Sequence, residues 1–92
     1  MRKYEAVFIL NAKEELFAAS KEKASQQLIE SGGTIVNEND MGIKKLTFPI
    51  KKEFEGHYII YDVEIDEKKL PELDKVYKLE DNILKYQFML AR

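Results

Sequence analysis

The 92-residue sequence contains no cysteine and a single histidine, His57. Without cysteine there can be no disulfide, no thiolate nucleophile and no cysteine-bound metal, which fits a reducing cytoplasm. One histidine leaves no histidine pair to hold zinc, and a lone histidine at the start of a strand is most often a surface residue. We therefore expect no metal, no cofactor and no histidine-based catalysis.

Long hydrophobic runs and an excess of basic charge are also missing. The apolar stretch over residues 4–10 is interrupted by Glu5 and ends at Asn11, so it reads as a buried strand rather than as a signal peptide or a membrane span. The net charge is −2, so any nucleic acid must be bound through a local basic patch. We expect no membrane contact.

The usual enzyme motifs are absent as well. Residues 11–14 contain no glycine, so no glycine-rich phosphate loop follows the first strand. The carboxylates of Asp62 and Glu64 alternate along a strand, which is typical of a solvated face, and no calcium-loop spacing accompanies them. We interpret the chain as a non-enzyme without a small-molecule substrate.

What the sequence does contain is the pattern of one α+β domain over residues 1–92. Strands are expected at 4–10, 34–50 (irregular over 37–42, with a bend at Gly42), 57–65 and 83–90, and a charged hairpin connection at 51–56. A helix capped by Asn11 should run to about Ser31 and end at Gly32, and Asp66 should cap a second helix. The order β-α-β-β-α-β predicts a ferredoxin-like fold, a four-stranded antiparallel sheet with both helices on one face. Because Pro49 cannot donate a ladder hydrogen bond, it should lie in an edge strand or at the end of a strand.

The uncovered face of that sheet is the first candidate site. If Ala6, Phe8 and Tyr61 face the helices, a set of apolar residues from three strands faces outward. An apolar surface on an uncovered sheet indicates a protein-partner site. The residues expected there, together with an aromatic residue of the second strand, are Val7, Ile9, Phe48, Tyr58, Ile60 and Met89.

Basic residues interleaved with aromatics form the second candidate site. Lysine pairs bracket residues 46–50, Arg2 precedes Tyr4, and further lysines lie near the last turn and strand. This arrangement suits phosphate contact with stacking, although lysine pairs also arise simply as solubilising surface. The predicted RNA contacts are Arg2, Tyr4, Lys44, Lys45, Lys51, Lys52, Lys78 and Lys85.

Three segments carry a resemblance to a known family. Residues 1–5 (MRKYE), 42–52 (GIKKLTFPIKK) with 56–58, and 81–85 (DNILK) are similar to bacterial small-subunit ribosomal protein six, in order over essentially the whole chain. The resemblance implies a ferredoxin-like ribosomal protein of the cytoplasm. It also implies assembly with small-subunit ribosomal protein eighteen on the platform and contact with the central domain of the small-subunit ribosomal RNA. Glu80 and Leu84 depart from the family by replacing basic residues.

A free-standing RNA-recognition module of the same topology is the alternative. Such modules present stacking aromatics on the central strands, where Tyr58 could serve while Phe8 and Tyr61 point inward. Their Lys/Arg-Gly-aromatic-Gly-aromatic signature is absent.

Overall fold

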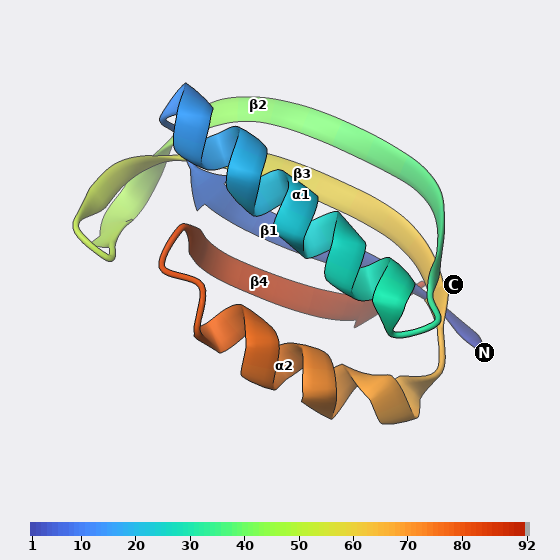
Figure 1. Cartoon of the computed structure of the whole chain (residues 1–92). Helices are drawn as coiled ribbons and strands as arrows, with labels where there is room; N and C mark the ends of the chain where they lie inside the picture. The colour runs from blue at the N-terminus through green and yellow to red at the C-terminus, as the bar shows by residue number, and fades with distance from the viewer. Residues whose placement is uncertain (92) are drawn as a thin grey trace.

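The computed structural model describes residues 1–91 and confirms the predicted order of elements. The elements are β1 (Arg2–Asn11), α1 (Glu14–Glu30), β2 (Thr34–Ile50), β3 (Glu53–Ile65), the short 3₁₀ helix η1 (Glu67–Lys69), α2 (Leu70–Lys78) and β4 (Ile83–Leu90). The strands form one antiparallel sheet in the order β2-β3-β1-β4, and both helices lie on one face of it (Figure 1). The β2 strand is an edge strand and Pro49 is its second-last residue, so both positions that the sequence left open for this proline apply.

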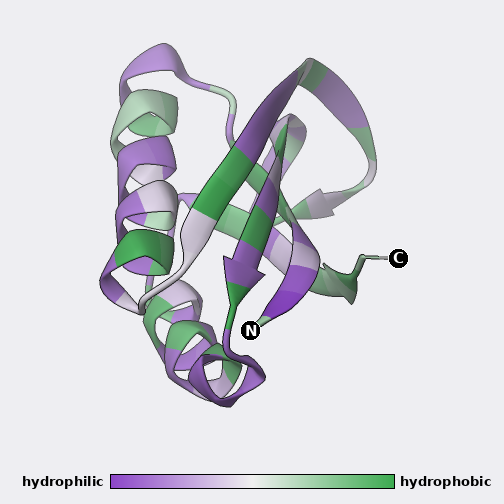
Figure 2. Cartoon of the chain, turned by 90° about the vertical axis from the view of Figure 1, so that its right-hand side faces the viewer, coloured by the Kyte–Doolittle hydropathy of each residue, from purple (hydrophilic) through white to green (hydrophobic). Residues whose placement is uncertain are grey.

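The core lies between the helices and the sheet because the central strands alternate as predicted. On β1 and β3, every second side chain is withdrawn from solvent, and Phe8, Ile59 and Tyr61 are completely buried. Leu28 of α1 and Tyr77 of α2 close the core from the helix side, where the Tyr77 hydroxyl donates to the Ala24 carbonyl over 2.8 Å. Figure 2 shows the two layers from the side.

The start of α1 differs from the prediction. Asn11 is not the N-cap; it is the last residue of β1, and Lys13 occupies the cap position without a side-chain cap hydrogen bond. The Asn11 backbone remains in the sheet, where it is paired with Gly56 of β3. Its N–H donates to the Asn82 carbonyl over 2.9 Å, and its side-chain oxygen accepts from the Lys13 N–H over 3.0 Å. Gly32 follows α1 with a φ of +87°, as predicted. Asp66 caps the short η1 rather than α2: its carboxylate accepts the Lys68 N–H, and the N-cap of α2 is Lys69, without a side-chain cap hydrogen bond.

The β2–β3 connection is shorter than the predicted 51–56 segment. The turn consists of Lys51 and Lys52 alone, with φ values of +49° and +67°, and β3 begins at Glu53. Two consecutive left-handed residues match the twist of a two-residue hairpin, a conformation that usually calls for asparagine or glycine. The two lysines at these positions therefore did not predict a two-residue turn. The predicted irregularity of β2 is confirmed, because its register shifts between Asp40 and Gly42, where Gly42 has a φ of +81°.

Candidate functional site

The face of the sheet opposite the helices carries an apolar patch made of Val7, Ile9, Tyr58 and Ile60. Ile9 stands opposite Tyr58, and Val7 stands opposite Ile60, so the four side chains meet across β1 and β3. Ile9 is 9% exposed and the other three are half-buried. Residues 1–91 place no helix over this face (Figure 1). An uncovered apolar patch with polar surroundings has the character of a protein-binding surface.

The surroundings of this apolar patch are charged with opposite signs at its two ends. Toward the β2–β3 turn, Lys85 stands opposite Ile9, and the Lys44 ammonium lies 5.6 Å from the centre of the Tyr58 ring. At the other end Glu5 stands opposite Asp62, and Met89 is the β4 neighbour of Glu5. Met89 therefore belongs to the open face as predicted. A docking partner meets positive charge at one end and negative charge at the other.

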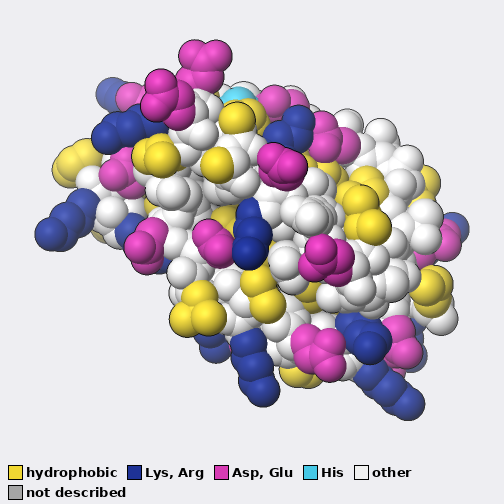
Figure 3. Space-filling view, viewed as in Figure 1, with side chains coloured by type: hydrophobic (Ala, Val, Ile, Leu, Met, Phe, Trp, Pro, Cys, Tyr) yellow, Lys and Arg dark blue, Asp and Glu magenta, His cyan; other side chains and the backbone are white. Residues whose placement is uncertain are grey.

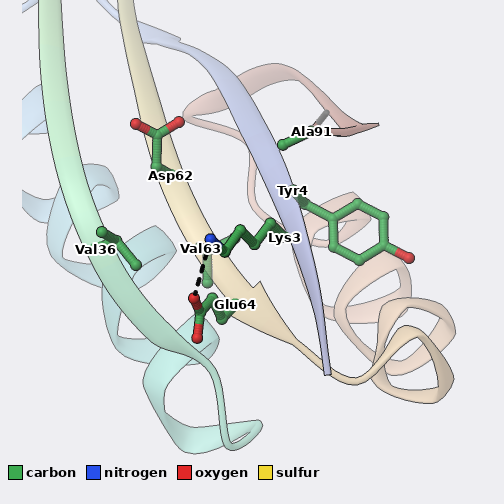
Figure 4. Close-up of a pocket in the computed structure, with 7 residues that line it drawn as sticks. All are labelled: Lys3, Tyr4, Val36, Asp62, Val63, Glu64 and Ala91. Carbon is green, nitrogen blue, oxygen red and sulfur yellow. Dashed lines mark ion pairs between the residues drawn. The ribbon is translucent and has the colours of Figure 1, made fainter.

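A small hollow of about 130 Å³ lies at the acidic end (Figure 4). Its walls include Val36, Asp62 and Ala91, and the Lys3 ammonium bridges to the Glu64 carboxylate at 4.0 Å. In Figure 4 the Tyr4 ring points away from Lys3, toward the helix side of the sheet.

The structure separates several of the predicted RNA contacts from the open face. Tyr4 is only 8% exposed, and its ring packs edge-on against Phe88, so it belongs to the core and not to a free surface. Arg2 lies opposite Ile65 at the far end of β1, and its guanidinium is 3.8 Å from the Glu67 carboxylate.

Lys45 and Phe48 are also displaced from the patch. Lys45 is the chain neighbour of Lys44, and strand alternation sends the two side chains to opposite faces. Phe48 lies in the unpaired segment of β2 between Lys45 and Ile50, and it is 77% exposed. Alternation and strand length therefore distribute the predicted basic residues over both faces and both ends of the sheet.

Three of the predicted lysines do converge, at the junction of the β2–β3 turn, the end of α2 and β4. Lys51, Lys78 and Lys85 line a hollow of about 360 Å³, which we refer to as the lysine hollow. Its other walls are Tyr77, Ile83, Leu84 and Tyr86, and no carboxylate of the described residues is among them. Three lysine residues line the hollow and no Asp or Glu residue does, so its charge favours an anion such as a phosphate.

Two of these lysines are already oriented by the fold. The Lys51 ammonium donates to the Glu80 and Ile83 carbonyls, each over 3.1 Å, which ties the hairpin turn to the α2–β4 turn. The Lys78 ammonium is 2.9 Å from Asp74, whose pKa is lowered by the Tyr86 hydroxyl and then by Lys78. Lys85 makes no ion pair within residues 1–91. Lys52 is exposed at the turn.

His57 has a structural place on the helix side of the sheet. Its ring stacks on Phe17 with centroids 3.7 Å apart, and its Nε2 contacts the Asp40 carboxylate. The same carboxylate accepts the Gly42 N–H at the β2 bulge over 2.9 Å. Together these contacts connect α1, β2 and β3.

This contact gives a pH-dependent prediction. The His57 hydrogen bond, followed by the Gly42 N–H, lowers the pKa of Asp40 from its ordinary 3.8, so its contribution to stability is present above that value and lost as pH falls through the lower folded value. Asp40→Asn should therefore reduce the free energy of unfolding at pH 5 by at most about 1 kcal/mol, because the pair is partly exposed. Urea titrations at pH 5 and pH 2.5 test this: an equal difference at both values would rule out the carboxylate charge as its source.

Within residues 1–91 no group of three or more His, Cys, Asp or Glu side chains could hold a metal ion. None of the helices in this part of the chain has the length and apolar character to cross a membrane.

Comparisons with known proteins agree with the fold. The sequence profile of a family described as "Ribosomal protein S6" matches residues 3–89. The chain is 37% identical over 91 residues to the small ribosomal subunit protein bS6 of Clostridium botulinum strain Loch Maree, covering 97% of each chain. It is 38% identical over 88 residues to the bS6 protein of Thermoanaerobacter pseudethanolicus, covering 94% of this chain and 93% of that one. The crystal structure of 30S ribosomal protein S6 from Thermotoga maritima superposes with a TM-score of 0.87 at 30% identity, covering 98% of this chain and 87% of that chain.

Proposed function

The chain belongs to the ribosomal protein S6 family of the small subunit, and from this premise we propose that it is a structural, non-catalytic constituent of the bacterial small ribosomal subunit. As one domain over residues 1–92 it binds the central domain of 16S ribosomal RNA on the platform. It does so together with small-subunit ribosomal protein eighteen, and supports assembly and translation in the cytoplasm. The observation that carries the proposal is the uncovered apolar patch flanked by Lys44 and Lys85.

The apolar patch supports the protein contact. Burial of Val7, Tyr58 and Ile60 by a partner removes half-buried apolar side chains from water, which is the main driving force of association. The opposite charges at the two ends of the patch orient the partner on the sheet. Protein eighteen is the occupant that family membership suggests.

The lysine hollow supports the RNA contact. Lys51, Lys78 and Lys85 come from three elements, so a phosphate bound there is fixed by the tertiary fold rather than by one segment. The net charge of −2 opposes tight binding of RNA by this chain alone. We therefore expect RNA binding to require the partner.

A filter-binding titration tests the proposal. Radiolabelled RNA of the 16S central domain is titrated with this chain alone, with protein eighteen alone, and with both. Tight retention by the pair only is the expected result. Equally tight, salt-sensitive retention by this chain alone would contradict the requirement for a partner, and no retention under any condition would overturn the proposed function.

The lysine hollow makes a quantitative prediction. Lys85→Gln and Lys78→Gln should each weaken RNA binding by the pair and reduce the slope of log K against log salt by about 1 per lost phosphate contact. Lys75→Gln is the matched control, since this exposed lysine lies on α2 outside the hollow. Titrations at low to moderate potassium concentrations measure the slopes. Equal slopes for Lys75→Gln and Lys85→Gln would show that the lysine hollow does not contact the RNA.

The stand-alone RNA-recognition module has less support. Phe8 and Tyr61 of the central strands are buried on the helix side, whereas Tyr58 lies in the apolar patch with Lys44 over its ring. Loss of RNA binding by Tyr58→Leu in the absence of protein eighteen would favour the module.

A further inference from the structure

The end of the β2–β3 hairpin, residues 44–56, forms an arm that carries two exposed phenylalanines. Phe48 is 77% exposed and Phe54 is 71% exposed, whereas Phe8 is fully buried and Phe17 and Phe88 pack against the core. In Figure 1 the arm extends from the body of the molecule and bends toward the α2–β4 turn. Two solvent-exposed aromatic rings on one projecting hairpin are candidates for contact with a partner.

The backbone explains why the rings point outward. Lys45 pairs with Glu55 and Ile50 pairs with Glu53, so residues 46–49 of β2 stand against Phe54 alone. Pro49 within this bulge has no N–H to donate to a ladder. A bulge of this kind redirects side chains away from the regular pleat. Both phenylalanines belong to this unpaired segment.

The arm is nevertheless held in place. Its turn has the left-handed conformation of a two-residue hairpin at Lys51 and Lys52, and the Lys51 ammonium is fixed by two carbonyls of the α2–β4 turn. The rings are therefore presented by a fixed support, which lowers the entropic cost of binding.

Charge indicates what kind of partner covers the rings. The arm has four lysines (Lys44, Lys45, Lys51 and Lys52) against two glutamates, a net charge of +2, while the whole chain has −2. Glu53 and Glu55 are the strand neighbours of Phe54, and alternation directs them to the opposite side from its ring. At the left of Figure 3, where the arm lies, hydrophobic side chains and Lys or Arg side chains stand together, with Asp or Glu side chains among them. Aromatic rings among lysines suit bases attached to a phosphate backbone.

We infer that the arm binds unpaired nucleotides of the RNA, with Phe48 and Phe54 stacking on bases and the arm lysines contacting the adjoining phosphates. This inference rests on the proposed function and adds a second RNA contact, distinct from the lysine hollow. It also reassigns Phe48, which the sequence placed in the protein-partner surface.

The test uses the double variant Phe48→Leu/Phe54→Leu in the complex with protein eighteen and central-domain RNA. Leucine keeps apolar volume but removes the aromatic face. We expect affinity for RNA to fall about 10-fold or more and a few unpaired bases to lose their protection from dimethyl sulfate, with the rest of the footprint unchanged. Leu79→Ala, which removes an 83% exposed side chain outside the arm, is the control and should change neither measurement.

A fluorescence measurement gives an independent readout. The chain has no tryptophan, so Phe48→Trp introduces a single indole whose emission base stacking should quench. The emission of the wild-type complex is subtracted from that of the variant complex. The measurement is made with central-domain RNA and with a duplex RNA of similar length, which has no unpaired bases to stack on the indole.

The possible results separate the inference from the proposed function. If the wild-type pair binds RNA and the double variant binds with the same affinity and footprint, the inference fails while the proposed function stands. If the double variant instead loses protein eighteen in the absence of RNA, the arm is a protein contact and the inference is overturned. If the wild-type pair does not bind the RNA, the proposed function itself fails.

Discussion

Replacing Ile60 with aspartate should abolish assembly with the partner protein and leave the fold intact. Ile60 is half-buried in the apolar patch, opposite Val7 and on the face away from the core. A partner seated on the patch would have to desolvate the new carboxylate, and Asp62 on the same strand face adds like charge. We expect the affinity to fall by at least about 100-fold, equivalent to roughly 2.7 kcal/mol. Isothermal titration calorimetry with protein eighteen measures it.

The control for this variant is Ile29→Asp. Ile29 lies on α1 on the other side of the molecule and is 58% exposed, so its replacement introduces the same charge away from the sheet face. Circular dichroism should show native melting for both variants. If Ile60→Asp bound protein eighteen with wild-type affinity, the partner would have to bind another surface than the open face. An equal loss of affinity in both variants would mean that the added negative charge, and not its position, weakens binding.

Replacing Phe8 with alanine should produce the largest loss of stability. Phe8 is fully buried, and its ring packs edge-on against Tyr61, Tyr77 and Phe88 with centroids 5.1 to 6.5 Å apart. Truncation of a buried phenylalanine costs about 3–5 kcal/mol, because transfer energy is lost and a cavity remains. A domain of this size has a total stability on the order of 5–14 kcal/mol. The variant should therefore lose a large part of its stability, measured by urea denaturation.

The comparison variant is Phe54→Ala. This ring is 71% exposed, so its removal should change the free energy of unfolding by less than about 0.5 kcal/mol. A loss below about 1 kcal/mol in Phe8→Ala would mean that the core tolerates the cavity by collapse, contrary to its close aromatic packing. A large loss in Phe54→Ala would mean that the arm stabilises the body.

The candidate site was only partly predictable. The alternation along β1 and β3 correctly placed Val7, Ile9, Tyr58 and Ile60 on one face. Side chains of a strand alternate between its two faces, so the face of every residue is set once the buried face is known. Phe54 was missed, since a single aromatic between two glutamates gives no signal of a bulge on the opposite strand. The grouping of Lys51, Lys78 and Lys85 was also missed, because residues far apart in sequence meet only after the hairpin turn docks on the α2–β4 turn.

Local chemistry in the sequence by itself determined the order of strands and helices, the glycine that ends α1, the restriction of Pro49 to an edge strand or a strand end, and the phase of the central strands. Each of these depends on neighbouring residues: a backbone conformation, a missing N–H or an alternating pattern. Only the tertiary structure decided that Asn11 remains in the sheet, that Tyr4 is core and that Arg2 and Lys44 lie far apart. These outcomes depend on which strand pairs with which and in what register, and the free energy of that pairing comes from contacts between residues distant in the chain.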